Sequence, residues 1–290
     1  MTRVSKRDII KGMLRGLPED IQGIVEVVQG NLIHLFWAER MGEKLTDVRR
    51  NEVNIRSVAD MLRIIYEKKP ALLTEHRSNS EKLVGNCRDF TVLAVSLLRE
   101  VGVPARARCG FSAYFGKVDE IEFMDHWVVE YWDTESQRWV MVDSQLDKFQ
   151  LDNLDIRFDP FYVPADKFLT AGSAWQMCRS GAANPDSFGL FDIHGFGFIK
   201  GNMIRDLAAL NKMPLLPWDC WGLILEDDES DEEMSLLDNI ASVTIPYTRD
   251  YENIHSLYTH PDLTVPNTII SWEGGKKPTK IKLSDITETH

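Results

Sequence analysis

The feature that most constrains this sequence is an apolar helical segment that begins beside a cysteine. Asn86 is a favoured helix N-cap residue, and apolar side chains then recur at helical intervals as far as Gly102. Glycine commonly ends helices because it adopts left-handed backbone angles without strain. The apolar positions are Val92, Leu93, Val95, Leu97, Leu98 and Val101. The pattern predicts a buried helix with Cys87 in its first turn.

Three strand-like segments follow this helix. Residues 105–115 come directly after Pro104, and residues 125–132 and 138–143 alternate aromatic and β-branched side chains. The polar residues 133–136 separate the last two segments, as expected for the loop of a β-hairpin. A helix followed by antiparallel strands predicts an α+β fold, with the cysteine-bearing helix packed on the sheet.

The flanking regions are expected to extend this core. Residues 57–70 and 24–36 show helical spacing, with Gly30 as a soft point between two possible helices in the second range. Beyond residue 150 no linker is apparent, and residues 226–233 are an acidic run typical of a solvated loop. We predict a domain over residues 1–225, with a helical part at 1–80, a motif core at 85–143 and an elaboration at 150–225, and then a loosely packed tail over 226–290.

Charge and composition narrow the class of partner. The chain has 290 residues, of which 43% are hydrophobic, so it is long enough to bury a sizeable core. Its formal net charge of -12 repels phosphate backbones, which argues against nucleic acid as a partner. No stretch of eighteen apolar residues is present, so no membrane partner is expected.

The cysteines suggest reduced thiols. There are 4 cysteines, at positions 87, 109, 178 and 220, and they form neither a C-x-x-C pair nor a zinc-knuckle pattern. With no visible export signal, this usage predicts a cytoplasmic protein. His126 and Glu130 have the spacing of a helical metal site, but their neighbours favour a strand, so we expect no metal and no cofactor.

Cys87 is the best candidate nucleophile. The N-terminus of a helix places free N–H groups and partial positive charge beside a thiol, which lowers its pKa. The same N–H groups can stabilise the oxyanion that forms when sulfur attacks a carbonyl carbon. The sequence therefore predicts an activated thiolate at Cys87.

His126 and Asp143 are the candidate base and its orienting residue. If residues 133–136 form the hairpin loop, strand pairing places His126 directly opposite Asp143, on the same face of the sheet. An aspartate beside a histidine fixes the imidazole tautomer in nucleophilic triads. The alternative is structural: Cys87 as a small core residue, and the His–Asp pair as an ordinary surface contact.

These segments together resemble the core of the transglutaminase-like superfamily. The resemblance rests on residues 85–90 (GNCRDF), 97–106 (LLREVGVPAR), 109–111 (CGF), 125–128 (DHWV) and 139–143 (WVMVD). It implies a papain-like fold with a catalytic triad of Cys87, His126 and Asp143. No calcium loops or β-sandwich domains of the animal enzymes are evident, so the chain looks more like uncharacterised microbial proteins with this domain. The resemblance does not assign an oxyanion-hole side chain, for which residues 74–79 are a place to look.

The expected function is acyl transfer through a thioester. The substrate would be a peptide, a protein or a small amide, and hydrolysis is the default because water is always present. A transamidase resembling protein-glutamine γ-glutamyltransferases, or an amide synthase, is the alternative within this class. The alternative outside it is a catalytically silent module that binds peptides in the same cleft. The sequence indicates neither the substrate nor the oligomeric state.

Overall fold

A computed structural model describes residues 6–227, 230–273 and 277–284 of the chain. The α-helices are α1 (Lys6–Met13), α2 (Ile21–Asn31), α3 (Asp47–Arg50), α4 (Val58–Lys68), α5 (Cys87–Glu100), α6 (Lys148–Leu154), α7 (Ala171–Arg179), α8 (Phe196–Leu210), α9 (Asp231–Val243) and α10 (Tyr251–Tyr258). Short 3₁₀ turns lie at Asn51–Asn54, Pro185–Ser187 and Gly222–Leu225. Among the described helices, none is long and apolar enough to cross a membrane.

The strands form three sheets. They are β1 (Leu32–His34), β2 (Leu83–Gly85), β3 (Ala105–Ser112), β4 (Phe123–Asp133), β5 (Arg138–Val142), β6 (Phe168–Thr170), β7 (Phe188–Leu190), β8 (Ile193–His194), β9 (Asp219–Cys220), β10 (Thr268–Ser271) and β11 (Thr279–Lys282). The central sheet has the order β6-β3-β4-β7-β8, and β5 also pairs with β4. The predicted α+β class is confirmed.

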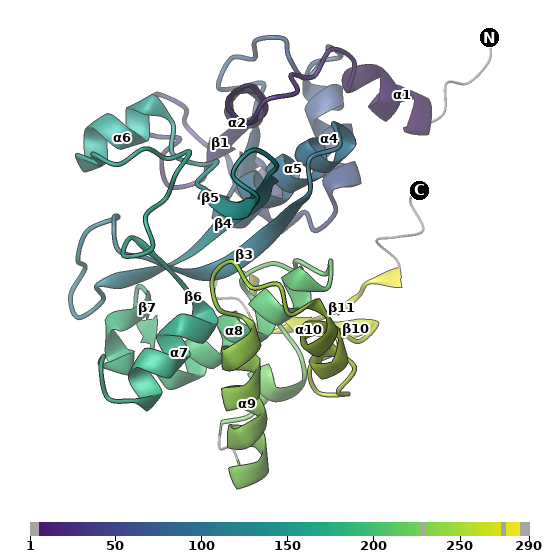
Figure 1. Cartoon of the computed structure of the whole chain (residues 1–290). Helices are drawn as coiled ribbons and strands as arrows, with labels where there is room; N and C mark the ends of the chain where they lie inside the picture. The colour runs from purple at the N-terminus through teal and green to yellow at the C-terminus, as the bar shows by residue number, and fades with distance from the viewer. Residues whose placement is uncertain (1–5, 228–229, 274–276, 285–290) are drawn as a thin grey trace.

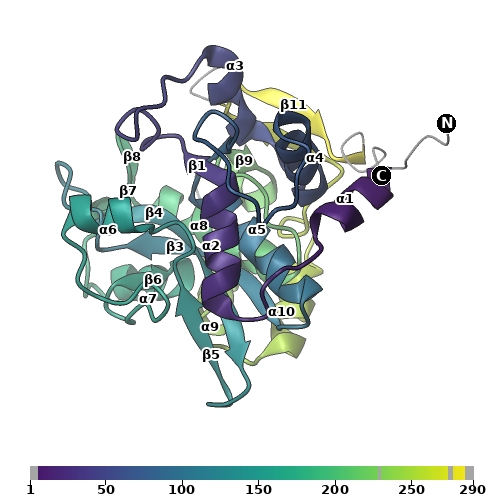
Figure 2. The ribbon, with the colours of Figure 1, turned by 90° about the horizontal axis from the view of Figure 1, so that it is seen from above.

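Helices cover the central sheet on both faces. In Figure 1, α2, α4 and α5 lie above β3 and β4, whereas α7, α8, α9 and α10 lie below them. Figure 2 shows the upper helices from above, with α2 beside α5. Trp127 and Val129 of β4 pack with α2 and α5 in one apolar core, and Phe111 of β3 packs with α7 and α8 in a second. A sheet covered on both faces is buried throughout, and all eight residues of β3 are buried.

The cysteine-bearing helix forms for the reasons that the sequence indicates. The Asn86 side chain accepts a hydrogen bond from the Asp89 N–H, and the Asp89 carboxylate accepts one from the Asn86 N–H, which makes a capping box. Leu93, Leu97 and most other apolar side chains of α5 are buried. The helix is therefore fixed at its N-terminus, where Cys87 lies.

One predicted helix is a strand instead. Residues 21–31 form α2, but Leu32–His34 form β1, which pairs in parallel with β2. Helix α2 ends at Asn31. The buried side-chain amide of Asn31 donates to the carbonyl oxygens of Leu73 and Val27, which ties the end of the helix to a distant segment. Pairing between β1 and β2 then replaces the helical hydrogen bonds. This exchange places His34 beside the segment that leads into Cys87.

The described residues between 226 and 284 pack more tightly than the predicted loose tail. Leu237 and Ile240 of α9 are fully buried against α7 and α8. Strand β10 also pairs with β9, which precedes the proposed boundary at residue 225. Within the acidic run, helix α9 begins at Asp231, while residues 228–229 lie outside the described residues. The domain boundary itself remains a prediction.

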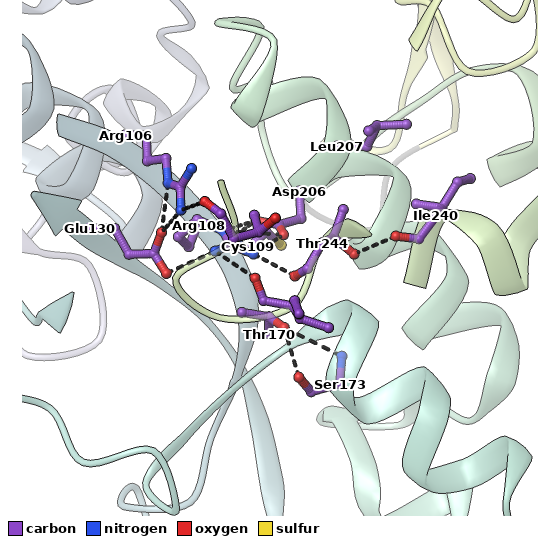
Figure 3. A network of polar contacts seen from close by, with 12 residues as sticks. Arg106, Arg108, Cys109, Glu130, Thr170, Ser173, Asp206, Leu207, Ile240 and Thr244 are labelled. Carbon is purple, nitrogen blue, oxygen red and sulfur yellow. Dashed lines mark hydrogen bonds and ion pairs between the residues drawn. The ribbon is translucent and has the colours of Figure 1, made fainter. Parts of the chain in front are cut away.

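A buried ionic network joins the central sheet to the lower helices (Figure 3). Arg108 of β3 donates to Glu130 of β4 at 2.8 Å and to Asp206 of α8 at 2.8 Å. Its guanidinium also donates to the Thr244 carbonyl oxygen at 2.6 Å, and Arg106 pairs with Glu130 at 2.6 Å. Removing one partner of such a network leaves an unpaired buried charge, which costs about 3–5 kcal/mol. The network therefore fixes α8 relative to β3 and β4.

Candidate active site

Cys87 lies against an open stretch on one edge of β4. The other edge of β4 pairs with β3, while on this edge β5 pairs with residues 129–133 and β7 pairs with residues 123–124. The Cys109 N–H bonds the Asp206 side chain at 2.7 Å and therefore points away from β4. Cys109 and its partner Trp127 are thus a non-hydrogen-bonded pair of the ladder. The Trp127 N–H consequently points away from β3, to the open edge of β4. There it hydrogen-bonds the half-buried Cys87 thiol.

His126 and Asp143 are hydrogen-bonded to each other. The distance between His126 Nε2 and Asp143 Oδ2 is 2.7 Å, and both side chains are almost fully buried. Because Trp127 follows His126 directly, the Cys87 sulfur lies beside the backbone of the histidine. The structure thus gathers the three residues that the sequence singles out around one stretch of β4.

The predicted hairpin register is wrong by two residues. Trp132 pairs with Trp139 and Asp133 with Arg138, so the loop is 134–137, and the ladder between β4 and β5 ends at Val129 and Val142. Since side chains alternate faces with a period of two, an even shift keeps Asp143 on the face of His126. Beyond the ladder the Asp143 N–H bonds the Pro160 carbonyl oxygen, which fixes the aspartate next to the histidine.

Asp143 is a carboxylate held by three donors. Tyr114 Oη donates to Oδ2 at 2.6 Å, and the Gln145 N–H donates to Oδ1 at 2.9 Å, in addition to the bond with His126. Burial alone would raise the pKa of Asp143, but the charge of His126 and these hydrogen bonds hold the pKa below its ordinary value. A carboxylate acceptor places the imidazole proton on Nε2 and leaves Nδ1 of His126 as the free basic atom.

Aromatic rings enclose the imidazole. Phe115 and Tyr114 lie edge-on to His126 with ring centroids at 4.9 Å and 5.7 Å, and Phe168 lies at 6.4 Å. Gly110 pairs with His126 across the ladder, and a Cβ atom there would approach the Leu169 carbonyl oxygen to 2.1 Å. A glycine is required at this position because β6 packs so closely. The enclosure keeps water from competing for Asp143.

The thiol itself is less acidic than the sequence predicts. Burial raises the pKa of Cys87 well above its ordinary value, and the negative charge of Asp125 raises it further, against a smaller lowering by the Trp127 N–H. Asp89 and Asp143 add to the increase. Together these effects raise the pKa of the thiol and so oppose ionisation of Cys87 at rest. The sulfur therefore needs a base at the moment of attack.

Helix α8 supports the strand that carries His126. Asn202 Nδ2 donates to Asp125 Oδ1 at 2.7 Å, and Arg205 Nη1 donates to Asn202 Oδ1 at 3.2 Å. Burial raises the pKa of Asp125, although the Asn202 hydrogen bond and the Arg205 charge partly offset this. The contact with Asn202 therefore fixes the carboxyl group that opposes ionisation of Cys87.

Other sequence expectations can also be placed. His126 bonds Asp143 whereas Glu130 bonds Arg106 and Arg108, so the two residues with metal-site spacing act separately. Within the described residues, no group of three or more His, Cys, Asp or Glu side chains is arranged to hold a metal ion. The loop 74–79 is organised around buried Arg77, which bonds backbone carbonyl oxygens of residues 69–75.

Sequence reasoning missed Tyr114, Asn202 and His34. Tyr114 reaches the His–Asp pair from a loop, and Asn202 reaches Asp125 from α8, and no local sequence pattern predicts either contact. His34 is buried, and burial followed by the charge of His126 lowers its pKa to about 3. The only sequence signal for a strand at His34 is the short apolar run after Gly30. A run of this length fits a buried helix as well as a strand, so the sequence does not distinguish them.

The comparison with protein families matches the part of the chain that carries these residues. Residues 41–144 match the model of the transglutaminase-like superfamily, and this range contains Cys87, His126 and Asp143. The chain carries a transglutaminase-like domain. The transglutaminase-like superfamily typically catalyses cysteine-dependent acyl transfer. Comparison with curated proteins gave no match, and comparison with solved structures gave none either.

Proposed function

We propose that the transglutaminase-like domain is a thiol acyl-transfer enzyme in which Cys87 is the nucleophile, His126 the base and Asp143 the residue that orients the base. The observation that carries this proposal is the buried 2.7 Å bond from His126 to Asp143, next to the peptide group that contacts the Cys87 sulfur. A solitary buried cysteine needs no such arrangement. The substrate class is an amide or peptide carbonyl.

The first half of the reaction forms a thioester. As the Cys87 sulfur attacks the carbonyl carbon, its proton passes to Nδ1 of His126, and the carbonyl oxygen becomes an oxyanion. Asp143 stabilises the imidazolium by remaining a carboxylate. When the tetrahedral intermediate collapses, the C–N bond breaks and His126 returns the proton to the departing amine. The acyl group then remains on sulfur.

The second half releases the acyl group to water. His126 takes a proton from water as the oxygen attacks the thioester, and it gives that proton to the sulfur as the C–S bond breaks. The products are a carboxylic acid and the free thiol. An amine in place of water would make the protein a transamidase or amide synthase, and failure of both steps would make it a peptide-binding module.

Site-resolved alkylation tests the proposed roles. Iodoacetamide would be applied near neutral pH to the wild-type chain and to His126→Gln, with Cys178 and Cys220 followed in the same sample as internal controls. We expect the substitution to slow labelling of Cys87 at least about tenfold, because general-base assistance contributes factors of 10²–10⁴, while the control cysteines keep their rates. An unchanged Cys87 rate would remove His126 as the base.

The acceptor is tested separately. A peptide and amide library would be incubated with the wild-type chain, with and without a primary amine such as glycine ethyl ester. Release of carboxylic acid products that persists in the presence of the amine supports hydrolysis. Formation of the new amide as the main product would overturn hydrolysis and favour the transamidase alternative. The Cys87→Ser variant is the control for turnover at other sites.

A further inference from the structure

His34 is fixed close to the nucleophile by strand pairing. It is the last residue of β1 and pairs with Gly85, the last residue of β2, two positions before Cys87. The Leu35 N–H bonds the Gly85 carbonyl oxygen at 2.9 Å, which extends the pairing past His34. The backbone of His34 therefore cannot move independently of the segment that begins α5.

The imidazole of His34 lies near α5 and within electrostatic reach of the His–Asp pair. Its ring centroid is 6.2 Å from that of Phe90, which is on α5 three residues after Cys87 and so on the same side of the helix. A charge on the ring would be repelled by His126 and attracted by Asp143, which shows that it is electrostatically coupled to both. The side chain is 7% exposed. It thus lies against the first turn of the helix that carries Cys87.

The hydrogen bonds of His34 define which of its edges is free. The Phe36 N–H donates to Nδ1 at 3.3 Å, so Nδ1 is an acceptor and the proton of the neutral ring is on Nε2. Burial, followed by the charge of His126, lowers the pKa of His34 to about 3, which keeps the ring neutral at physiological pH. Among the described residues, nothing accepts a hydrogen bond from Nε2.

The two histidines present opposite capacities to the site. Both carry their proton on Nε2. In His126 this N–H is hydrogen-bonded to Asp143, which leaves the basic Nδ1 free, whereas in His34 Nδ1 accepts a hydrogen bond and the Nε2–H donor is free. A neutral imidazole with a free N–H polarises a carbonyl oxygen without competing as a base. The backbone N–H of Cys87 is a second donor, because it belongs to the first turn of α5.

We propose that His34 is a catalytic residue whose Nε2–H, together with the Cys87 backbone N–H, binds the oxyanion formed on the substrate carbonyl. This inference rests on the proposed acyl transfer at Cys87. It assigns to β1 the donor that the sequence leaves unassigned, with the loop 74–79 as a place to look. As the carbonyl oxygen gains charge, the two N–H groups stabilise it, and no proton leaves His34 during the step.

Two reactions of the same sulfur test this role. Alkylation by iodoacetamide is a displacement at carbon that forms no oxyanion, whereas acylation by p-nitrophenyl acetate passes through one. The variants are His34→Gln, which retains an N–H donor, and His34→Met, which has similar volume and none. We expect His34→Met to slow acylation of Cys87 by about 10²-fold or more, as for other oxyanion donors, and to leave alkylation within about twofold. His34→Gln should recover part of the acylation rate.

The outcomes separate this inference from the proposed function. If wild-type Cys87 is alkylated but never acylated, acyl transfer fails and the role of His34 fails with it. If wild-type Cys87 is acylated and His34→Met is acylated equally fast, only the role of His34 is overturned. Slowing of both reactions by the same factor would assign His34 a structural role and also overturn the inference. His126→Gln is the positive control, because it should slow both reactions.

Discussion

Tyr114→Phe removes a single hydrogen bond to a buried carboxylate. The hydroxyl of Tyr114 donates to Asp143 Oδ2 at 2.6 Å, and the tyrosine side chain is itself buried. Hydrogen bonds to charged groups contribute about 1.5–3 kcal/mol to stability. The His126 and Gln145 bonds to Asp143 remain in the variant, so the carboxylate keeps two donors. We therefore expect the free energy of unfolding to fall by about 2 kcal/mol at pH 7.

The pH dependence of this loss identifies its cause. The pKa of Asp143 is below its ordinary value in the folded protein, so stabilisation of the carboxylate is fully present above the unfolded pKa of about 4 and is lost as pH falls through the folded pKa. The difference between wild type and variant should hence be constant from pH 7 to about pH 5 and shrink at lower pH.

Urea unfolding measured from pH 7 downward supplies the assay. The matched control is Tyr162→Phe, since the hydroxyl of Tyr162 accepts a bond from Arg138 at an exposed position. We expect this control to change the free energy of unfolding by less than about 0.5 kcal/mol. A Tyr114→Phe loss no larger than that of the control, or a loss that grows as pH falls, would refute the assignment of Asp143 as a charged acceptor.

Three further predictions concern buried charges. Asp125→Asn removes a charge that raises the pKa of Cys87, so the pH profile of Cys87 alkylation should move to lower pH, and a move upward would contradict the electrostatics. Burial raises the pKa of Asp89 to about 6 despite the Arg88 charge, so the folded state binds this proton more tightly than the unfolded state does. Wild type should therefore lose about 3 kcal/mol of unfolding free energy as pH rises from about 4 to about 6. Asp89→Asn should flatten this slope, and an identical slope in urea titrations would exclude Asp89 as its source. Arg108→Met leaves the Asp206 carboxylate without its ion-pair partner, while Glu130 keeps Arg106, and should lower the unfolding free energy by about 3–5 kcal/mol; a calorimetric loss under about 1 kcal/mol would show that the network is not stabilising.

The local features of the site could be predicted from sequence. The Asn86 cap and the apolar periodicity that follows it place Cys87 at the start of a helix, and alternation places His126 and Asp143 on one hairpin. The register prediction was wrong because residues 133–136 look like the loop, whereas Asp133 still pairs with Arg138. The period of two preserved the shared face despite the error.

The environment of the site could not be predicted in the same way. Burial and the charge of Asp125 raise the pKa of Cys87, and neither effect is visible in the sequence around the cysteine. Asn202 reaches Asp125 from α8, about eighty residues further along the chain, and His34 arrives through parallel pairing of β1 with β2. Parallel pairing leaves no turn signal in the sequence, because its strands are joined by long connections.

The central claim is that Cys87 forms a thioester with the help of His126. Peptide mass mapping after a brief reaction with p-nitrophenyl acetate and an acid quench measures this directly. We expect one acetyl group on Cys87 in the wild-type chain, and a much lower yield in His126→Gln under the same conditions. Acetylation of other residues with Cys87 left free, or an equal yield at Cys87 in both proteins, would contradict the account.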